Sequence, residues 1–144
     1  MNSNQGNSLD YSGQFESNTV LELSTQKTDP VNGTKYVLIK HDYYASDNDN
    51  GRELLSRFLS ALCDSTSGSL TVYLVDQGTK LLDKNNLLYT EMINFIEKAE
   101  TVISDNDSMA FYDVEAVKNP KVVLQDSNSI VEDLIYIPDI FILE

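Results

Sequence analysis

The sequence has few of the residues that cross-link small proteins or bind metals. It contains one cysteine and one histidine in 144 residues. A single cysteine cannot form an internal disulfide, and one residue of each kind cannot build the usual four-ligand zinc site. With only three prolines and six glycines, the chain is neither collagen-like nor of low complexity. Its longest apolar runs are about five residues, against roughly 20 in a membrane-spanning helix, so we expect no membrane span.

Basic residues are also scarce. Ten Lys+Arg stand against 23 Asp+Glu, which gives a net charge of -13 and an isoelectric point near 4.2. Binding to nucleic acid or to an anionic membrane needs a positive surface, so we expect neither partner. Residues 1–6 lack the basic and apolar stretches of a signal peptide, and we therefore expect a cytoplasmic protein with a reduced thiol.

The composition of the chain changes near residue 35. Residues 1–35 are rich in Asn, Ser, Gln, Thr and Gly, and we predict a polar arm or linker there. Phe15 and the alternating run 19–23 form an apolar island, which could be an edge strand, an arm that docks on another subunit, or only an apolar patch in a tail. Residues 36–144 are predicted to form one domain.

Apolar periodicity predicts alternating strands and helices in this domain. Short apolar runs predict strands at residues 36–40, 70–75, 101–104, 121–125 and 139–144. Apolar residues at helical spacing predict helices at 54–63, 88–99 and 110–117, and a last helix around 130–135 that is N-capped near Ser127. This order predicts a single-domain α/β fold: a mostly parallel five-stranded sheet with helices on both faces, in flavodoxin-like layering.

Ligands of such sheets bind beyond the carboxyl ends of the strands. The residues that follow the strands therefore define a candidate pocket, together with Tyr112 just beyond the third strand's exit. Its members are His41, Asp42, Asp76, Gln77, Gly78, Lys80, Asp105, Asn106, Ser108, Met109 and Tyr112.

Three familiar chemistries each lack an essential residue. A calcium loop over residues 46–57 would have Arg57 in the place of its bidentate glutamate. Asp42 and Asp105 could hold Mg²⁺ for aspartyl phosphorylation, but no lysine follows the fifth strand, which ends at Glu144. No glycine-rich phosphate loop is present, so we expect neither a metal nor a cofactor.

Four side chains each allow two interpretations. His41 is either a general base or a half-exposed loop residue. Cys63 is either a reactive thiol or a small buried hydrophobe, with a raised pKa, on the apolar side of its helix. Lys80 could meet an anion in a loop that otherwise serves the backbone, and Tyr112 either packs or presents its hydroxyl to the pocket.

Three stretches of the domain resemble one known family. Residues 51–62 are similar to the helix pattern G-x-x-L-M-x-x-F-L-x-x-L, and residues 75–81 are similar to the strand exit N-x-G-V-K-L. Residues 102–112 are similar to I-L-S-C-G-T-C-L-D-F-Y. In this order they resemble the DsrE-like sulfur-relay superfamily, most closely the C-terminal domain of YedF-type proteins of selenium metabolism, which are described as sulfurtransferase-like. The resemblance covers residues 36–144 and implies a sulfur-relay fold that often assembles into homo-oligomers.

The chain departs from this family at the residues that carry sulfur. Asp105 and Ser108 stand where the family pattern has cysteines, and a persulfide carrier needs a thiolate. One interpretation is a non-catalytic relative that binds a partner or a small ligand, as a structural subunit of a homo-oligomer. The other is an enzyme or sulfur carrier with relocated chemistry, at Cys63 or at His41 with Asp105. If Asp105 and Asp107 face one pocket, we also expect them to bind a cation or a cationic group.

Overall fold

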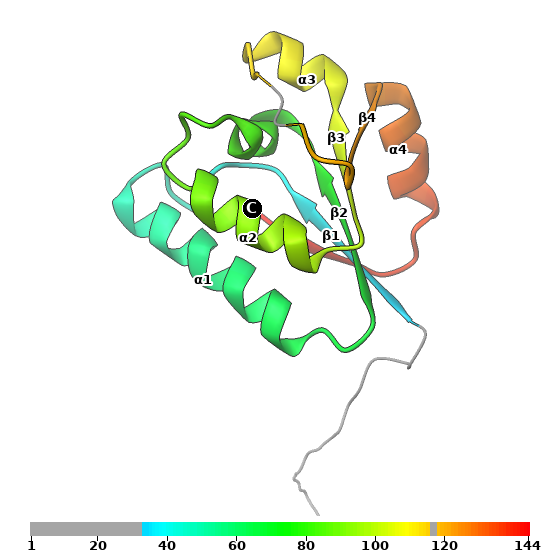
Figure 1. Ribbon diagram of the computed structural model, residues 1–144. Coiled ribbons are helices and arrows are strands. Elements are labelled where there is room, and N and C mark those ends of the chain that lie inside the picture. The colour runs from blue at the N-terminus through cyan, green and yellow to red at the C-terminus, as the bar shows by residue number, and fades with distance from the viewer. Residues whose placement is uncertain (1–32, 116–117) are drawn as a thin grey trace, which may run out of the picture. The chain divides into compact units, whose positions relative to one another are not determined.

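The computed structural model describes residues 33–115 and 118–144 (Figure 1). The arm expected over residues 1–35, with its apolar island, lies almost entirely outside the described residues. Strands and helices alternate along the described chain. The strands are β1 (Thr34–Ile39), β2 (Ser69–Leu74), β3 (Thr101–Asp105), β4 (Val122–Gln125) and β5 (Ile140–Leu143). The helices are α1 (Asp49–Ser65), the 3₁₀ helix η2 (Asp76–Leu82), α2 (Tyr89–Lys98), α3 (Asn106–Phe111) and α4 (Ser127–Tyr136).

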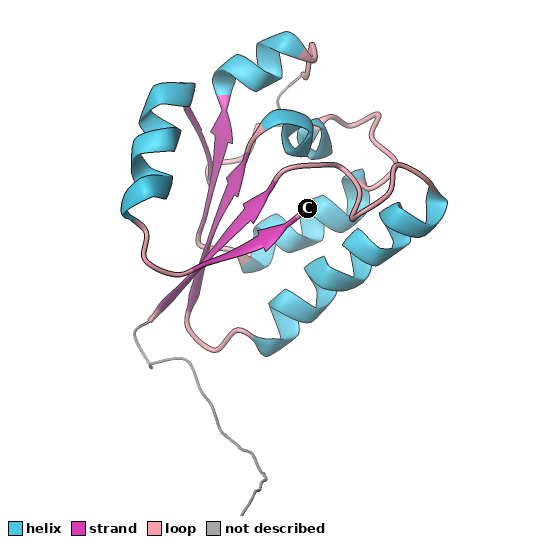
Figure 2. Ribbon diagram, turned by 180° about the vertical axis from the view of Figure 1, so that it is seen from behind, coloured by secondary structure: helices cyan, strands magenta, loops and turns pink. Residues whose placement is uncertain are grey.

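The five strands form one sheet in the order β4-β3-β2-β1-β5, and every neighbouring pair is parallel. The chain steps in one direction from β1 to β4 and then crosses back to β5. Because crossovers between parallel strands are right-handed, α1 and α2 lie on one face of the sheet and α4 on the other (Figures 1 and 2). The expected α/β class, with a five-stranded parallel sheet and helices on both faces, is confirmed.

The face covered by α1 and α2 carries the main core. Val37, Val72, Val102 and Val122 pair in register from β1 to β4 and share this face. Leu55 and Leu59 of α1 and Met92, Phe95 and Ile96 of α2 pack against it, and each is at most 2% exposed. The apolar spacing of both helices is therefore explained by this single contact surface.

The opposite face has a much smaller core, because one helix covers it. Ile130 of α4 packs on Tyr73 and Ile103, and half-buried Leu134 and Ile137 extend this contact. Figure 2 shows this face with α4 beside β3 and β4, while β1 and β5 lie open. The middle of the sheet is thus covered on the α1 and α2 side, where Leu124 and Phe141 of the outer strands remain partly exposed, and the other side is about half covered.

Several element boundaries differ from those that the sequence predicts. α1 begins at Asp49, because the Asn48 side chain caps it by accepting a hydrogen bond from the Gly51 amide at 2.8 Å. The exit after β2 is a 3₁₀ helix rather than a loop. The short helix predicted at 110–117 is instead α3, which begins directly after β3, and residues 116–117 lie outside the described residues. α4 is capped by Asp126 rather than by Ser127.

Within the described ranges, no helix is both long enough and apolar enough to cross a membrane.

Candidate functional site

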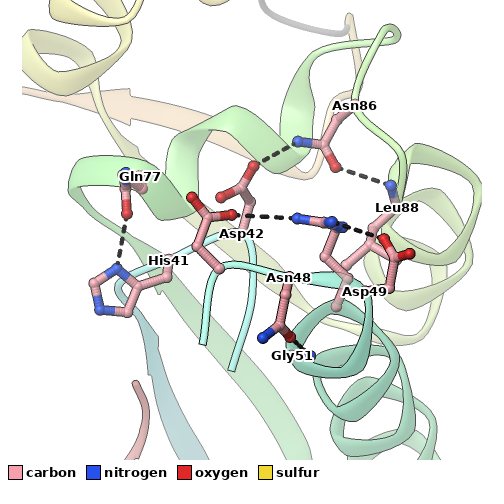
Figure 3. A network of polar contacts seen from close by, with 10 residues as sticks. His41, Asp42, Asn48, Asp49, Gly51, Gln77, Asn86 and Leu88 are labelled. Atoms are coloured by element: carbon pink, nitrogen blue, oxygen red, sulfur yellow. Dashed lines mark hydrogen bonds and ion pairs between the residues drawn. The ribbon is translucent and has the colours of Figure 1, made fainter. Parts of the chain in front are cut away.

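The exit of β1 presents the only histidine of the chain, and its ring is held in place. His41 Nδ1 donates a hydrogen bond to Gln77 Oε1 at 3.0 Å (Figure 3). The imidazole also stacks on Tyr43, with ring centroids 4.7 Å apart. Two expected pocket residues, from the exits of β1 and β2, therefore contact each other directly. The contact orients His41 and uses one of its two ring nitrogens.

The next residue, Asp42, is tied to the segment that leads into α2. Asn86 Nδ2 donates to Asp42 Oδ2 at 3.0 Å, and Asn86 Oδ1 accepts from the Leu88 amide at 2.9 Å (Figure 3). The Asp42 carboxylate therefore links the β1 exit to the start of α2. No pattern in the sequence singles out Asn86, which lies 44 residues from its partner.

Asp105, at the end of β3, is the centre of the largest polar cluster at this edge. Its side chain is only 6% exposed. One oxygen accepts from the Asp107 amide at 3.0 Å and caps α3, and the other accepts from Ser108 Oγ at 2.8 Å. Ser127 Oγ, at the start of α4, donates to the same carboxylate at 2.8 and 2.9 Å. The buried charge is thus surrounded by donors of the chain itself.

The neighbouring contacts extend this cluster to η2 and α4. Ser108 Oγ accepts from the Asp76 amide at 2.9 Å, which links α3 to the start of η2. Asp107 Oδ2 accepts from the Ser127 amide at 3.0 Å, which links α3 to α4. Asp105, Asp107, Ser108 and Ser127 therefore form one network, here called the β3-exit network, that connects three strand exits.

Asp76 and Tyr112 form the outer part of the site. Asp76 has a positive φ of 50°, an unusual conformation for a residue other than glycine. Its carboxylate accepts from the Tyr112 hydroxyl at 2.9 Å, and this hydrogen bond raises the pKa of Tyr112. Lys80 Nζ lies 5.2 Å from the centre of the Tyr112 ring, within the range of a cation–π contact.

A small cavity of about 190 Å³ opens beside these two side chains. Its lining consists of Lys80, Asp83, Asn85, Asn86, Tyr112 and Val114. Only Lys80 and Tyr112 were among the expected pocket residues. The others lie in the polar segment between η2 and α2 and after α3, where the sequence shows no periodic signal.

Three expected pocket residues have other places in the structure. Met109 is 4% exposed and its sulfur accepts a hydrogen bond from Ser104 Oγ, so it belongs to the core. Gly78 is buried, and a Cβ there would collide with the carbonyl oxygen of Ile39. Asn106 is exposed at the start of α3. The structure thus brings together most of the expected residues, but through contacts with one another rather than around an open space.

Cys63 lies in the last turn of α1 and lines a separate cavity of about 290 Å³ between α1 and α2. It is half-buried, and its neighbours in the cavity include Leu59, Phe95 and Lys98. Burial raises the pKa of the thiol, Lys98 lowers it in part, and Asp64 raises it. The raised pKa expected from the sequence is confirmed.

The carboxylates at the strand exits do not form a metal centre. Among the residues that the structure describes, no group of three or more His, Cys, Asp or Glu side chains could hold a metal ion. Asp105 and Asp107 both accept hydrogen bonds from Ser127, and neither lines the cavity beside Lys80 and Tyr112. Cation binding by this pair stays a prediction.

Comparison of the chain with models of known protein families finds no match, and comparison with curated proteins finds none either.

Proposed function

We propose that this chain is a DsrE-like α/β domain that acts as a non-catalytic binding protein and carries no sulfur. The observation that supports this function best is the β3-exit network. The two positions that correspond to the family's cysteines, Asp105 and Ser108, are hydrogen-bonded to each other at 2.8 Å. Their remaining capacity is used by Ser127 and by the Asp76 amide.

The chemistry of these two residues argues against transfer of sulfur at this edge. Neither a carboxylate nor an unactivated hydroxyl can accept and release sulfane sulfur. A general base beside Ser108 could activate it, but Asp105 already accepts from several donors. The ring of His41 is turned to Gln77 instead. The residues at the former thiol positions therefore serve to join β3, α3 and α4.

The competing function is a sulfur carrier that uses Cys63. One feature favours it, because the thiol lines a cavity that also contains Lys98. The net direction of its pKa is nevertheless upward, so less thiolate is present at neutral pH than in an ordinary cysteine. A carrier thiol needs the opposite shift, and we therefore place this function second.

Cavity size favours a macromolecular partner over a small ligand. Pockets for drug-sized ligands occupy about 300–1,000 Å³. The two cavities described above, of about 290 and 190 Å³, lie at or below the lower limit of this range. The proposed binding activity is therefore directed at another protein chain.

Sulfur loading of the native protein tests this function. The full chain is incubated with inorganic polysulfide and its intact mass is measured, with the Cys63→Ser variant as the matched control. We expect no gain of sulfur on native Cys63, and slow reaction with iodoacetamide that becomes rapid only after unfolding. A native chain that gains one sulfur atom at Cys63 and passes it to a thiol acceptor would overturn the proposal.

A further inference from the structure

The half of the sheet face beside α4 is an apolar surface that no helix in the described part of the chain covers. Residues of β1 and β5 that point to this face are Tyr36, Leu38, Ile140 and Ile142, here called the open half-face. Ile142 is 44% exposed, and the other three are half-buried. In Figure 2 no drawn helix covers these two strands.

A second apolar surface lies on the outside of α4 itself. Ile130 and Leu134 turn toward the sheet, and at 100° per residue Val131, Ile135 and Tyr136 turn away from it. Ile135 is 71% exposed, Tyr136 84% and Val131 52%. These three residues are here called the outer side of α4. Large apolar side chains this exposed on one short helix indicate a contact surface.

The charges on this side of the sheet favour a buried contact. About a quarter of the chain, 23%, is charged. The side chains that β1, β2 and β5 present to this face are uncharged: Thr34, Tyr36, Leu38, Ser69, Thr71, Tyr73, Ile140 and Ile142. Charged groups lie at its rim, where Asp133 of α4 accepts from the Tyr73 hydroxyl at 3.3 Å and Lys40 pairs with Glu144 just beyond β1 and β5. Each cation or carboxylate at this rim already has a partner in the chain, so the middle of the face favours an apolar contact.

We propose that a second copy of this chain covers the open half-face, by placing the outer side of its α4 there. This inference specifies the partner of the binding function proposed above and rests on it. One copy offers both a protruding apolar helix and an apolar sheet surface beside it. A two-fold axis would bring each helix onto the other copy's sheet, so the same contact forms twice.

The exposed apolar area amounts to about half of what one side of such a contact needs. A fully exposed large side chain contributes about 150–250 Å². On that basis Ile135, Tyr136 and Ile142 leave roughly 300–500 Å² exposed. Each partner in a stable dimer contributes about 800 Å². The apolar groups thus supply about half of one side, and Val131, which is 52% exposed, adds to it.

The mass of the full chain in solution tests the proposal, measured by light scattering and by sedimentation over a range of concentrations. We expect twice the 16.2 kDa of one chain. The net charge of -13 repels a second copy, so raising the salt from about 0.1 M to about 1 M should tighten the dimer. A chain that remains a monomer at every concentration in high salt would overturn the proposal. This holds even if another protein is found to cover this face.

Single substitutions locate the interface. Ile135→Glu and Ile142→Glu should each weaken the dimer about tenfold or more, while circular dichroism shows that the chain remains folded. Leu87→Glu is the matched control, because Leu87 is 76% exposed in the segment before α2 and the added charge is the same. We expect it to leave the dimer unchanged.

The results separate this proposal from the proposed function. A dimer that is insensitive to both substitutions, or equally sensitive to Leu87→Glu, would overturn the assigned surface. A dimer that is broken as expected but gains sulfur on Cys63 would overturn the non-catalytic function and leave the interface in place.

Discussion

Replacement of Asp105 by alanine tests whether the β3-exit network stabilises the fold. Alanine would remove the N-cap of α3, which costs about 0.5–2 kcal/mol. It would also remove the acceptor for the hydroxyl groups of Ser108 and Ser127. Hydrogen bonds to a charged group contribute about 1.5–3 kcal/mol each.

We expect the free energy of unfolding to fall by about 3–4 kcal/mol, which is less than these contributions taken together. The expected loss is smaller than this sum because Ser108 and Ser127 are only half-buried, so that their hydroxyls can bond to water once the carboxylate is removed. The expected loss is still large beside the about 5–15 kcal/mol that stabilises a domain of this kind.

Urea unfolding followed by circular dichroism measures this loss, since the chain has no tryptophan. Asp107→Ala is the control: its exposed carboxylate accepts from the Ser127 amide, and we expect it to cost about 1 kcal/mol or less. A loss below about 1 kcal/mol for Asp105→Ala, or equal losses in the two variants, would refute the reasoning.

Three further predictions concern other parts of the domain. Burial and the nearby Asp133 carboxylate raise the pKa of Tyr73 to about 12; the unfolded chain releases this proton near pH 10, so stability should fall by about 2–3 kcal/mol between pH 10 and 12. In urea titrations the Tyr73→Phe variant should lack this fall in the free energy of unfolding between pH 10 and 12. A variant with the same pH profile as the native chain would contradict the assignment to Tyr73. Gly78→Ala should cost at least about 2 kcal/mol, because the new methyl group collides with the Ile39 carbonyl; an unchanged urea midpoint would show that the turn moves freely. Lys121→Met should cost about 1–2 kcal/mol in thermal unfolding, because its ammonium donates to two carbonyls at the end of α2, at 2.7 and 2.9 Å, and a melting temperature equal to that of the native chain would argue that water replaces the ammonium.

Much of the fold could be predicted from the sequence because apolar spacing reports which side of an element is buried. The runs around Val37, Val72 and Val102 alternate with amphipathic stretches, and each became a strand or a helix as expected. Strand order could not be predicted, since five apolar runs carry no record of their neighbours. The position of α3 was missed because its start depends on a cap, Asp105, that also ends a strand.

The candidate site was predictable by location but not by its contacts. The rule that strand exits meet at one edge brought His41, Asp76 and Asp105 into consideration. It could not reveal that Ser127, 22 residues beyond Asp105, donates twice to its carboxylate. Hydrogen bonds between distant segments depend on how strands are ordered, and that order has no local sequence signal.

The return of the chain from β4 to β5 also has a consequence for the order in which the domain folds. β1 pairs with β2 across a separation of 35 residues, as between Thr34 and Ser69, but it pairs with β5 across 104, as between Tyr36 and Ile140. Closing the longer loop costs roughly 1 kcal/mol more entropy, at about 0.6 kcal/mol for each doubling of length. The unit from β1 to β3 can therefore form from near-neighbour contacts, and β5 docks onto an existing edge of the sheet. Until it does, β1 is itself an edge strand, and its unpaired backbone groups are open to pairing with other chains.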